Sequence, residues 1–218
     1  MERRLVILRR WLLLAAGLIF ESFGIVLSIR ADLGVTPISS IPYIFSLKFS
    51  KVTIGGWTLV ISAVFLAIQL ILLNKRFQRK YWLQIPILVL FCIFLDSLNY
   101  LMRGVVMHNY WESILFVLAG TVFLAWGITL CYTADICMNT GEAIVGAITT
   151  VTKKEFGKVK IAFDATLVVC TIIISLCFFN TLRAVREGTV VMALFTGFFV
   201  HLFSKFLNRK TADAAQNK

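Results

Sequence analysis

The amino-acid sequence predicts an all-α membrane protein of about six transmembrane helices, built as two inverted three-helix repeats. Hydrophobic residues make up 59% of the 218 residues and charged residues only 15%, and the mean hydropathy is +0.87. A soluble domain is closer to about 45–50% apolar and about 25% charged. One water-soluble core cannot bury this much apolar surface, so lipid must cover the remainder.

Six apolar segments are each long enough to cross a bilayer, which requires about 20 residues in a helix. They span residues 11–30, 54–74, 82–102, 113–133, 159–180 and 189–208. Two shorter apolar segments, 37–49 and 141–152, follow the first and the fourth of these. As helices they would be under about 20 Å long, because each residue adds about 1.5 Å. We therefore predict two half-helices, each either re-entrant or lying in the membrane interface.

Basic residues lie in short clusters between the apolar segments. The net charge is +11, but the clusters form no continuous basic face, so we do not expect a nucleic-acid partner. With a cytoplasmic N-terminus, most of the 22 Lys and Arg residues fall in cytoplasmic segments. The positive-inside rule then predicts a multi-pass protein of the bacterial cytoplasmic membrane, with both termini in the cytoplasm.

Two copies of one motif indicate the repeat. The pattern Gly-x-x-Phe-x-x-x-Gly-Ile at residues 17–25 recurs at residues 120–128. Each half has three spans, so the second half must enter the membrane from the opposite side. We predict a first transmembrane repeat over residues 1–106, a second over 107–210, and a polar cytoplasmic tail over 211–218.

The repeat places polar residues at mirrored depths. Asp32 falls opposite Asp135, each just past the end of a span, and Asp96 falls opposite His201. Asn99 lies on the same helical face as Asp96. Carboxylate and imidazole groups within a membrane are usual parts of proton relays, so these residues are candidates for a substrate or ion path. The alternative is a buried polar cluster that fixes helix packing.

The two half-helices have recognisable starts. Thr36 can serve as the N-cap of the first, with Pro37 at the first helical position. Residues 139–142, which include the candidate Glu142, can cap the second in a similar way. Free N–H groups at such starts carry partial positive charge and can hold an anionic group of a ligand. The alternative is an interfacial helix that only anchors the fold.

Further ionisable residues lie in or beside the spans. Glu21 is midway along the first span, where a carboxylate faces the bundle interior or is protonated; its alternative role is a buried structural hydrogen bond. Lys160 and Asp164 are four residues apart and can form an ion pair, which either lines a path or only anchors the helix end. Arg186 opens the last span and is a candidate ligand-binding residue.

A family resemblance is carried by short segments spread over nearly the whole chain. They are residues 31–43, 53–55, 83–86, 96, 141–143, 156–164 and 186–189. These segments resemble the YczE/YyaS/YitT family of bacterial integral membrane proteins, in particular its uncharacterised Firmicutes-type subfamily. The resemblance implies a membrane location and a role in transport, without a substrate. Relatives have a turn of the Gly-Pro-Arg-Asp type where this chain has Thr140-Gly141-Glu142, so a role of that turn does not carry over.

Signatures of catalysis such as GxSxG, HExxH and GxxxxGK[ST] are absent from the sequence, so we do not expect an enzyme. The five cysteines have no metal-ligand spacing, so we expect neither a metal nor a cofactor. We predict a small transporter or permease for a small molecule or ion. One alternative is a substrate-binding subunit that docks on a larger transport complex through small residues such as Ala63 and Ala67. A homodimer is the other assembly that we consider. Another alternative is a structural or regulatory membrane protein without transport.

Overall fold

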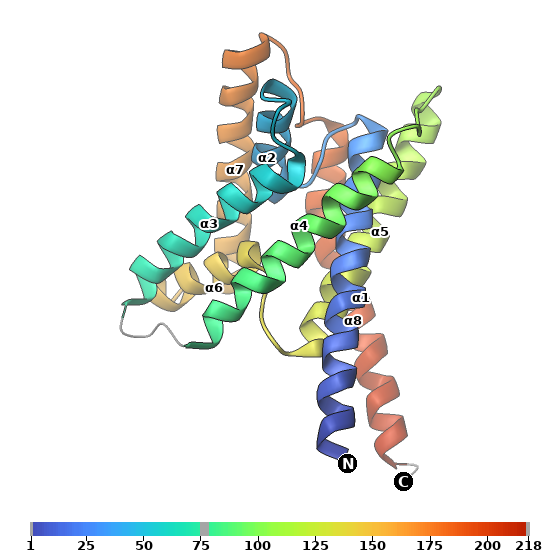
Figure 1. Cartoon of the computed structure of the whole chain (residues 1–218), viewed down its shortest axis with the longest axis vertical. Helices are drawn as coiled ribbons and strands as arrows, with labels where there is room; N and C mark the ends of the chain where they lie inside the picture. Colours follow the sequence, from blue (N-terminus) through green and yellow to red (C-terminus); the bar gives the residue numbers. More distant parts are fainter. Residues whose placement is uncertain (1, 75–78, 217–218) are drawn as a thin grey trace.

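The computed structural model describes residues 2–74 and 79–216, and all regular structure in that part of the chain is helical (Figure 1). Its α-helices are α1 (Glu2–Ala31), α2 (Pro37–Lys48), α3 (Ile54–Leu73), α4 (Gln84–Leu101), α5 (Tyr110–Ala134), α6 (Thr140–Thr152), α7 (Phe156–Phe179) and α8 (Glu187–Gln216). A short 3-10 segment, η2 (Arg79–Leu83), precedes α4. Helix α8 takes in most of the predicted tail, whose residues 217–218 lie outside the described residues.

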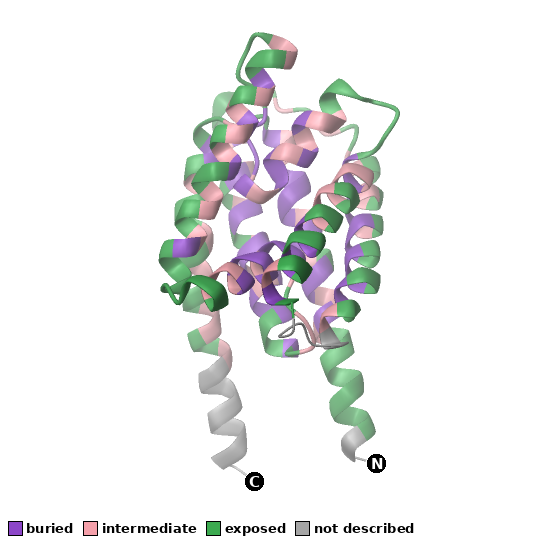
Figure 2. Ribbon diagram, turned by 90° about the vertical axis from the view of Figure 1, so that its left-hand side faces the viewer, coloured by how far each residue is buried: buried purple, intermediate pink, exposed green. Residues whose placement is uncertain are grey.

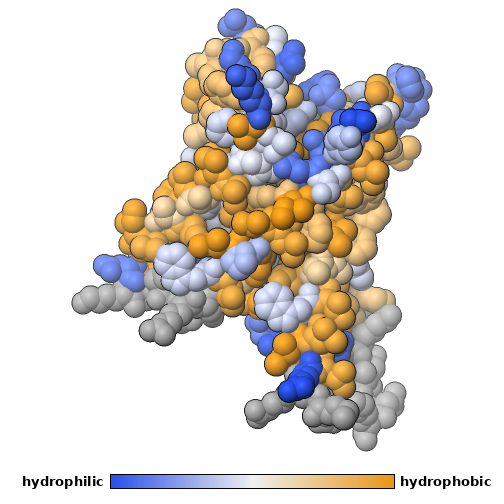
Figure 3. Space-filling view, viewed as in Figure 1, coloured by the Kyte–Doolittle hydropathy of each residue, from blue (hydrophilic) through white to orange (hydrophobic). Residues whose placement is uncertain are grey.

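Six of these helices are long and apolar enough to cross a membrane, which confirms the predicted number of spans. The spans are Arg4–Ala31, Ile54–Leu73, Tyr81–Leu101, Tyr110–Ala134, Phe156–Phe179 and Glu187–Leu207. The first begins before the predicted start at residue 11, because the helix continues through Arg9 and Arg10 and arginine is a good helix former. Apolar side chains cover most of the face shown in Figure 3, as contact with lipid requires.

Helices α2 and α6 are the two predicted half-helices. They contain 12 and 13 residues, so each is about 18–20 Å long against a hydrocarbon core of about 30 Å. Both begin inside the bundle, where the side chain of Ile38 lies against Gly141. Helix α2 ends beside the C-terminal end of α7, where Lys48 lies over the ring of Phe178, whereas α6 ends just before α7 begins. The two half-helices therefore start together in the interior and end at opposite ends of α7.

Helices α1 and α5 run antiparallel and form the most extensive helix contact in the bundle (Figure 1). A Cβ atom on Gly24 would lie only 2.5 Å from the carbonyl oxygen of Gly120, and one on Gly127 only 2.6 Å from the carbonyl oxygen of Gly17. Small residues allow this backbone approach, which stabilises helix pairs in lipid, where apolar side chains gain little from association. The four glycines belong to the repeated motif, so its two copies pack directly on each other.

Most of the remaining helix contacts come in matched pairs, although the α3–α4 contact has no extensive α7–α8 counterpart in the described part of the chain. Helix α1 packs on α4 as α5 packs on α8, α2 packs on α3 as α6 packs on α7, and the α2–α7 contact is matched by the α3–α6 contact. Phe20 and Phe123, which occupy the same place in the two motif copies, stack with ring centroids 5.8 Å apart. A two-fold relation between the halves would produce these pairs. The inverted repeat, with its boundaries at residues 106 and 107, stays a prediction.

Helices α1 and α5 end in the same way at opposite ends of the bundle (Figure 1). Asp32 and Asp135 follow them in the left-handed conformation, with φ of 52° and 49°. Aspartate tolerates this conformation better than most residues, because its short polar side chain can form local hydrogen bonds. Both chain termini lie at one end of the molecule (Figure 1), as an even number of spans requires. That this end faces the cytoplasm stays a prediction.

Buried residues lie on the inward faces of the helices (Figure 2), and their apolar side chains form two clusters. The larger cluster joins α1, α4 and α5 and includes Phe91 and Leu124. The smaller joins α3, α6 and α7 and includes Phe65. These three side chains also line a cavity that lies between the two clusters.

The glycine contact predicts that Gly24→Ala destabilises the bundle. The added Cβ would meet backbone atoms of α5, which cannot turn aside as the end of a side chain can. Overpacking of this kind costs about 1–3 kcal/mol, which exceeds the gain of about 1 kcal/mol from alanine's better helix propensity. We expect a lower unfolding temperature of the purified protein in detergent. Gly146→Ala on α6 is the matched control, since no atom lies within 4 Å of its Cβ position, and an equal loss there would contradict the prediction.

The opposite directions of α2 and α6 predict where the segments that follow them are accessible. Ser50 and Lys154 come directly after the two half-helices, and both are exposed. In a background without the five native cysteines, Ser50→Cys and Lys154→Cys should react with a membrane-impermeant thiol reagent from opposite sides of the membrane. Labelling of both from the same side in intact cells and inverted vesicles would rule out the inverted arrangement.

Candidate functional site

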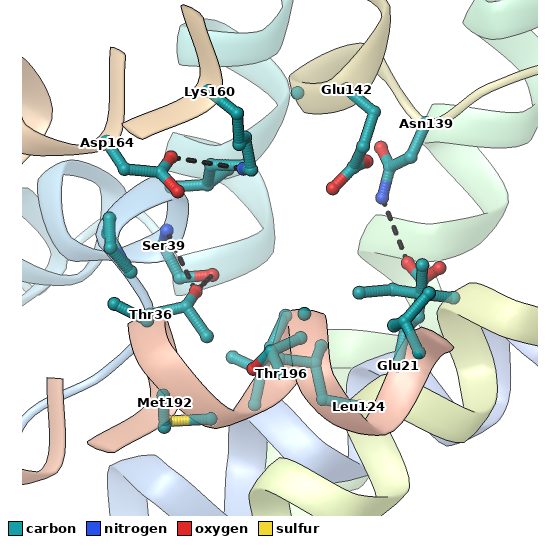
Figure 4. Close-up of a pocket in the computed structure, with 18 of the residues that line it drawn as sticks. Glu21, Thr36, Ser39, Leu124, Asn139, Glu142, Lys160, Asp164, Met192 and Thr196 are labelled. Atoms are coloured by element: carbon teal, nitrogen blue, oxygen red, sulfur yellow. Dashed lines mark hydrogen bonds and ion pairs between the residues drawn. The ribbon is translucent and has the colours of Figure 1, made fainter. Parts of the chain in front are cut away.

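A cavity of about 380 Å³ lies where the two half-helices begin, and residues from α1 through α8 line it (Figure 4). Most of its lining is apolar. Its polar and ionisable members are Glu21, Thr36, Ser39, Thr58, Ser62, Tyr132, Asn139, Glu142, Lys160, Asp164 and Thr196. The cavity is at the lower end of the range of about 300–1,000 Å³ that is typical of small-molecule sites.

Glu21 lies on α1 with only 2% of its surface exposed. Its Oε2 atom accepts a hydrogen bond of 2.9 Å from the side-chain amide of Asn139. Asn139 occupies the N-cap position of α6, but its side chain forms no cap hydrogen bond, so the capping predicted for residues 139–142 is wrong for this residue. A buried carboxylate needs a hydrogen-bond donor. The Asn139 amide therefore donates to Glu21, and the Asn139 side chain does not cap α6. The contact ties the middle of α1 to the start of α6.

Glu142 is the third residue of α6, and its side chain points into the cavity (Figure 4). Within the described part of the chain its carboxylate forms no ion pair and no hydrogen bond to another residue. It interacts electrostatically with Glu21 and, with opposite sign, with Lys160. Two carboxylates from different helices therefore share one wall of the cavity.

Lys160 and Asp164 form the predicted ion pair, with Nζ 3.0 Å from Oδ1. The two side chains are 27% and 17% exposed and lie on the wall across the cavity from Glu21 (Figure 4). Because both line the cavity, the pair is placed where a solute would meet it. It also neutralises one carboxylate of the site.

The start of α2 contributes a polar edge to the same cavity. The backbone N–H of Ser39 donates to Thr36 Oγ1 at 3.3 Å, and the Thr36 hydroxyl donates to Ser39 Oγ at 2.9 Å. Thr36 is the N-cap and Pro37 the first helical residue, so the predicted helix start is confirmed. The positive end of the α2 dipole therefore faces the cavity.

Asp96, Asn99 and His201 lie outside the cavity and are not brought together. Asp96 accepts hydrogen bonds from the Thr53 hydroxyl at 2.7 Å and the backbone N–H of Gly55 at 2.8 Å. The carboxylate thereby provides an acceptor for a backbone N–H in the first turn of α3. Asn99 Oδ1 accepts from Arg30 at 2.7 Å, and His201 is exposed on α8. The structure thus contains no contact between the carboxylate and the imidazole that the repeat pairs.

Asp32, Asp135 and Arg186 also lie away from the cavity, at the ends of helices. Arg186 donates to the carbonyl oxygen of Asp32 at 2.7 Å and lies 3.9 Å from its carboxylate. Asp135 pairs with Arg10 at 2.7 Å. These are exposed ion pairs, which contribute about 0–1 kcal/mol each. Their visible role is to hold helix ends to neighbouring helices.

Several cavity residues were not among the predicted site residues. The sequence predicts Asn139 only as a cap and Lys160 only as a partner of Asp164, although a lysine inside an apolar segment is a usable signal. Tyr132 and Thr196 had no signal, because tyrosine and threonine near the ends and interiors of membrane helices are common. Their position in the cavity depends on helix rotation.

A chain whose described regular structure is all helical, with six membrane-length helices and an internal cavity that contains ionisable side chains, is a multi-spanning integral membrane protein. The chain belongs to DUF6198, a family of unknown function, which it matches over residues 8–205. It is 25% identical over 201 residues to the uncharacterized membrane protein YczE of Bacillus subtilis (strain 168), an alignment that covers 90% of this chain and 85% of that protein. The predicted resemblance to YczE-like proteins is therefore confirmed. No solved structure matches the chain.

The hydrogen bonds of Asp96 predict a stability effect. Asp96→Ala should lower the free energy of unfolding by about 1–2 kcal/mol, because it leaves the Thr53 hydroxyl and the Gly55 N–H without an acceptor. Asp96→Asn keeps one acceptor oxygen and should lose less, which chemical denaturation of the purified protein would measure. Unchanged stability in both variants would show that the start of α3 does not depend on this side chain.

Proposed function

We propose that the protein is a small transporter that moves a solute through the cavity between its two halves. The observation that carries the proposal is that two half-helices, ending at opposite ends of α7, begin in one cavity that contains intramembrane carboxylates. Ionisable groups inside a membrane are costly and generally mark substrate or ion paths. Broken helices that meet at mid-membrane are typical of the sites of secondary transporters.

Alternating access would follow from how the two predicted halves are joined. The close α1–α5 contact couples the halves rigidly, because its backbone atoms are in direct contact. The matched α2–α7 and α3–α6 contacts lie around the cavity and also connect the halves. We propose that these contacts loosen in turn, opening the cavity to one side and then to the other, with no chemical change to the solute.

The location proposed for this activity is the bacterial cytoplasmic membrane, with both termini in the cytoplasm. The distribution of basic residues supports this orientation. The alternative of a subunit that docks on a larger complex draws on Ala63 and Ala67, which are exposed on α3. Purification as a lone monomer or a homodimer would weaken that alternative. Purification as a stable assembly with an ATPase would favour the docking alternative.

Transport predicts that a broad metabolite panel contains at least one solute that proteoliposomes with the protein take up. Glu21→Gln should reduce this uptake by about tenfold or more, equivalent to about 1.4 kcal/mol, because it removes a charge from the cavity while keeping its shape. Uptake is measured with and without an imposed proton gradient. Glu155→Gln, the same change on an exposed surface ion pair, should leave it unchanged. The absence of flux for the whole panel from folded, reconstituted protein would reject the proposal.

A further inference from the structure

We infer that the cavity binds a small organic cation, an ammonium group on an apolar body, in competition with protons at Glu21 and Glu142. This inference rests on the proposed function, since it names the class of solute for the same cavity. The charges on the wall, the apolar remainder of the lining and one unpartnered hydroxyl each support it.

The charged groups that line the cavity do not balance. Three carboxylates face it, those of Glu21, Glu142 and Asp164, against the single ammonium of Lys160. The ion pair of 3.0 Å between Lys160 and Asp164 accounts for one charge of each sign. Two carboxylates therefore remain, and they repel each other. An uncompensated charge in a largely apolar site is costly, so a bound cation or a bound proton stabilises this pair.

The groups around this carboxylate pair offer no second compensating charge. The lining residues of α2, α3, α4 and α8 include no titratable side chain. Helix α5 contributes Tyr132 to the lining, and Cys131 hydrogen-bonds to Glu21; both groups are neutral at physiological pH. The start of α2 carries only the partial charge of a helix end. A solute that carries one positive charge would satisfy the site.

The rest of the lining indicates an organic cation in preference to a metal ion. Most of the wall is apolar, with isoleucine, leucine, phenylalanine and methionine among its side chains. Among the described residues no group of three or more His, Cys, Asp or Glu side chains could hold a metal ion. Hard metal ions such as Ca²⁺ and Mg²⁺ bind through about six or more oxygen ligands, whereas an ammonium group on an apolar body matches two carboxylates within an apolar wall.

Thr196 supplies a separate observation that points to a ligand. Its hydroxyl oxygen is buried and has no hydrogen-bond partner in the described part of the chain. The residue lies on α8 and lines the same cavity, beside Met192 (Figure 4). A buried polar atom without a partner costs free energy, so a polar group of the solute would complete this site.

Three probes that share one phenyl body test the inference: 2-phenylethylamine, 3-phenylpropanoate and phenylalanine, which carry a cation, an anion and both charges. Binding to the purified full-length protein is measured by equilibrium dialysis, with the rise in unfolding temperature as a second readout. We expect the amine to bind at least about tenfold more tightly than the other two, a difference of about 1.4 kcal/mol. Its affinity should fall from pH 8 to pH 5, because protons compete for the carboxylates while the amine stays charged.

Glu142→Gln should weaken amine binding about tenfold or more, because the side chain faces the cavity and its carboxylate forms no ion pair or hydrogen bond with another described residue. Glu155→Gln is the control with the same chemical change on an exposed residue, and it should bind the amine normally. Tighter binding of the carboxylate or of phenylalanine, no binding of any probe, or full amine affinity in Glu142→Gln would overturn the inference. Amine binding without flux in proteoliposomes would contradict the proposed function and leave the assigned ligand class intact. Flux of anions without amine binding would support the proposed function and contradict the assigned ligand class.

Discussion

The backbone contact between α1 and α5 is the interaction on which the rest of this structure depends. Lipid removes the hydrophobic advantage of helix association, so two membrane helices hold together through close packing. The four motif glycines bring the two backbones within contact distance. The absence of a side chain at Gly127 also makes room for Glu21, since a Cβ there would lie 2.8 Å from its Cγ atom. The contact that assembles the bundle therefore also positions the cavity carboxylate.

The half-helices explain why a cavity with polar groups exists in so apolar a chain. A helix that begins inside the membrane leaves backbone N–H groups unpaired there, which is tolerated only where protein or a cavity surrounds them. Thr36 satisfies this need at the start of α2 through its own side chain. At the start of α6, the Asn139 side chain does not cap the helix and instead donates a hydrogen bond to Glu21. The two starts meet at Ile38 and Gly141, so the polar ends of both helices face one shared space.

The predicted site divides into two groups for a physical reason. Glu21, Thr36, Pro37, Glu142 and Asp164 line the cavity, whereas Asp32, Asp96, Asn99, Asp135, Arg186 and His201 lie elsewhere. Sequence periodicity gives the depth of a residue along a span, but each residue turns by about 100°, so partners depend on how neighbouring helices are rotated. Asp96 is the clearest example. Its depth in the span is suitable for a substrate or ion path, but the rotation of α4 directs its side chain to the start of α3.

Hydrophobic length is a local property, and for this reason the amino-acid sequence alone determined the membrane location, the six spans and the two half-helices. The repeated glycine motif was also visible in it. Tertiary structure alone decided which carboxylates share a cavity, that Asn139 donates a hydrogen bond to Glu21, and that Lys160 lines the cavity. These outcomes depend on contacts between residues far apart in the chain, 118 positions in the case of Glu21 and Asn139, and no local pattern encodes such a distance.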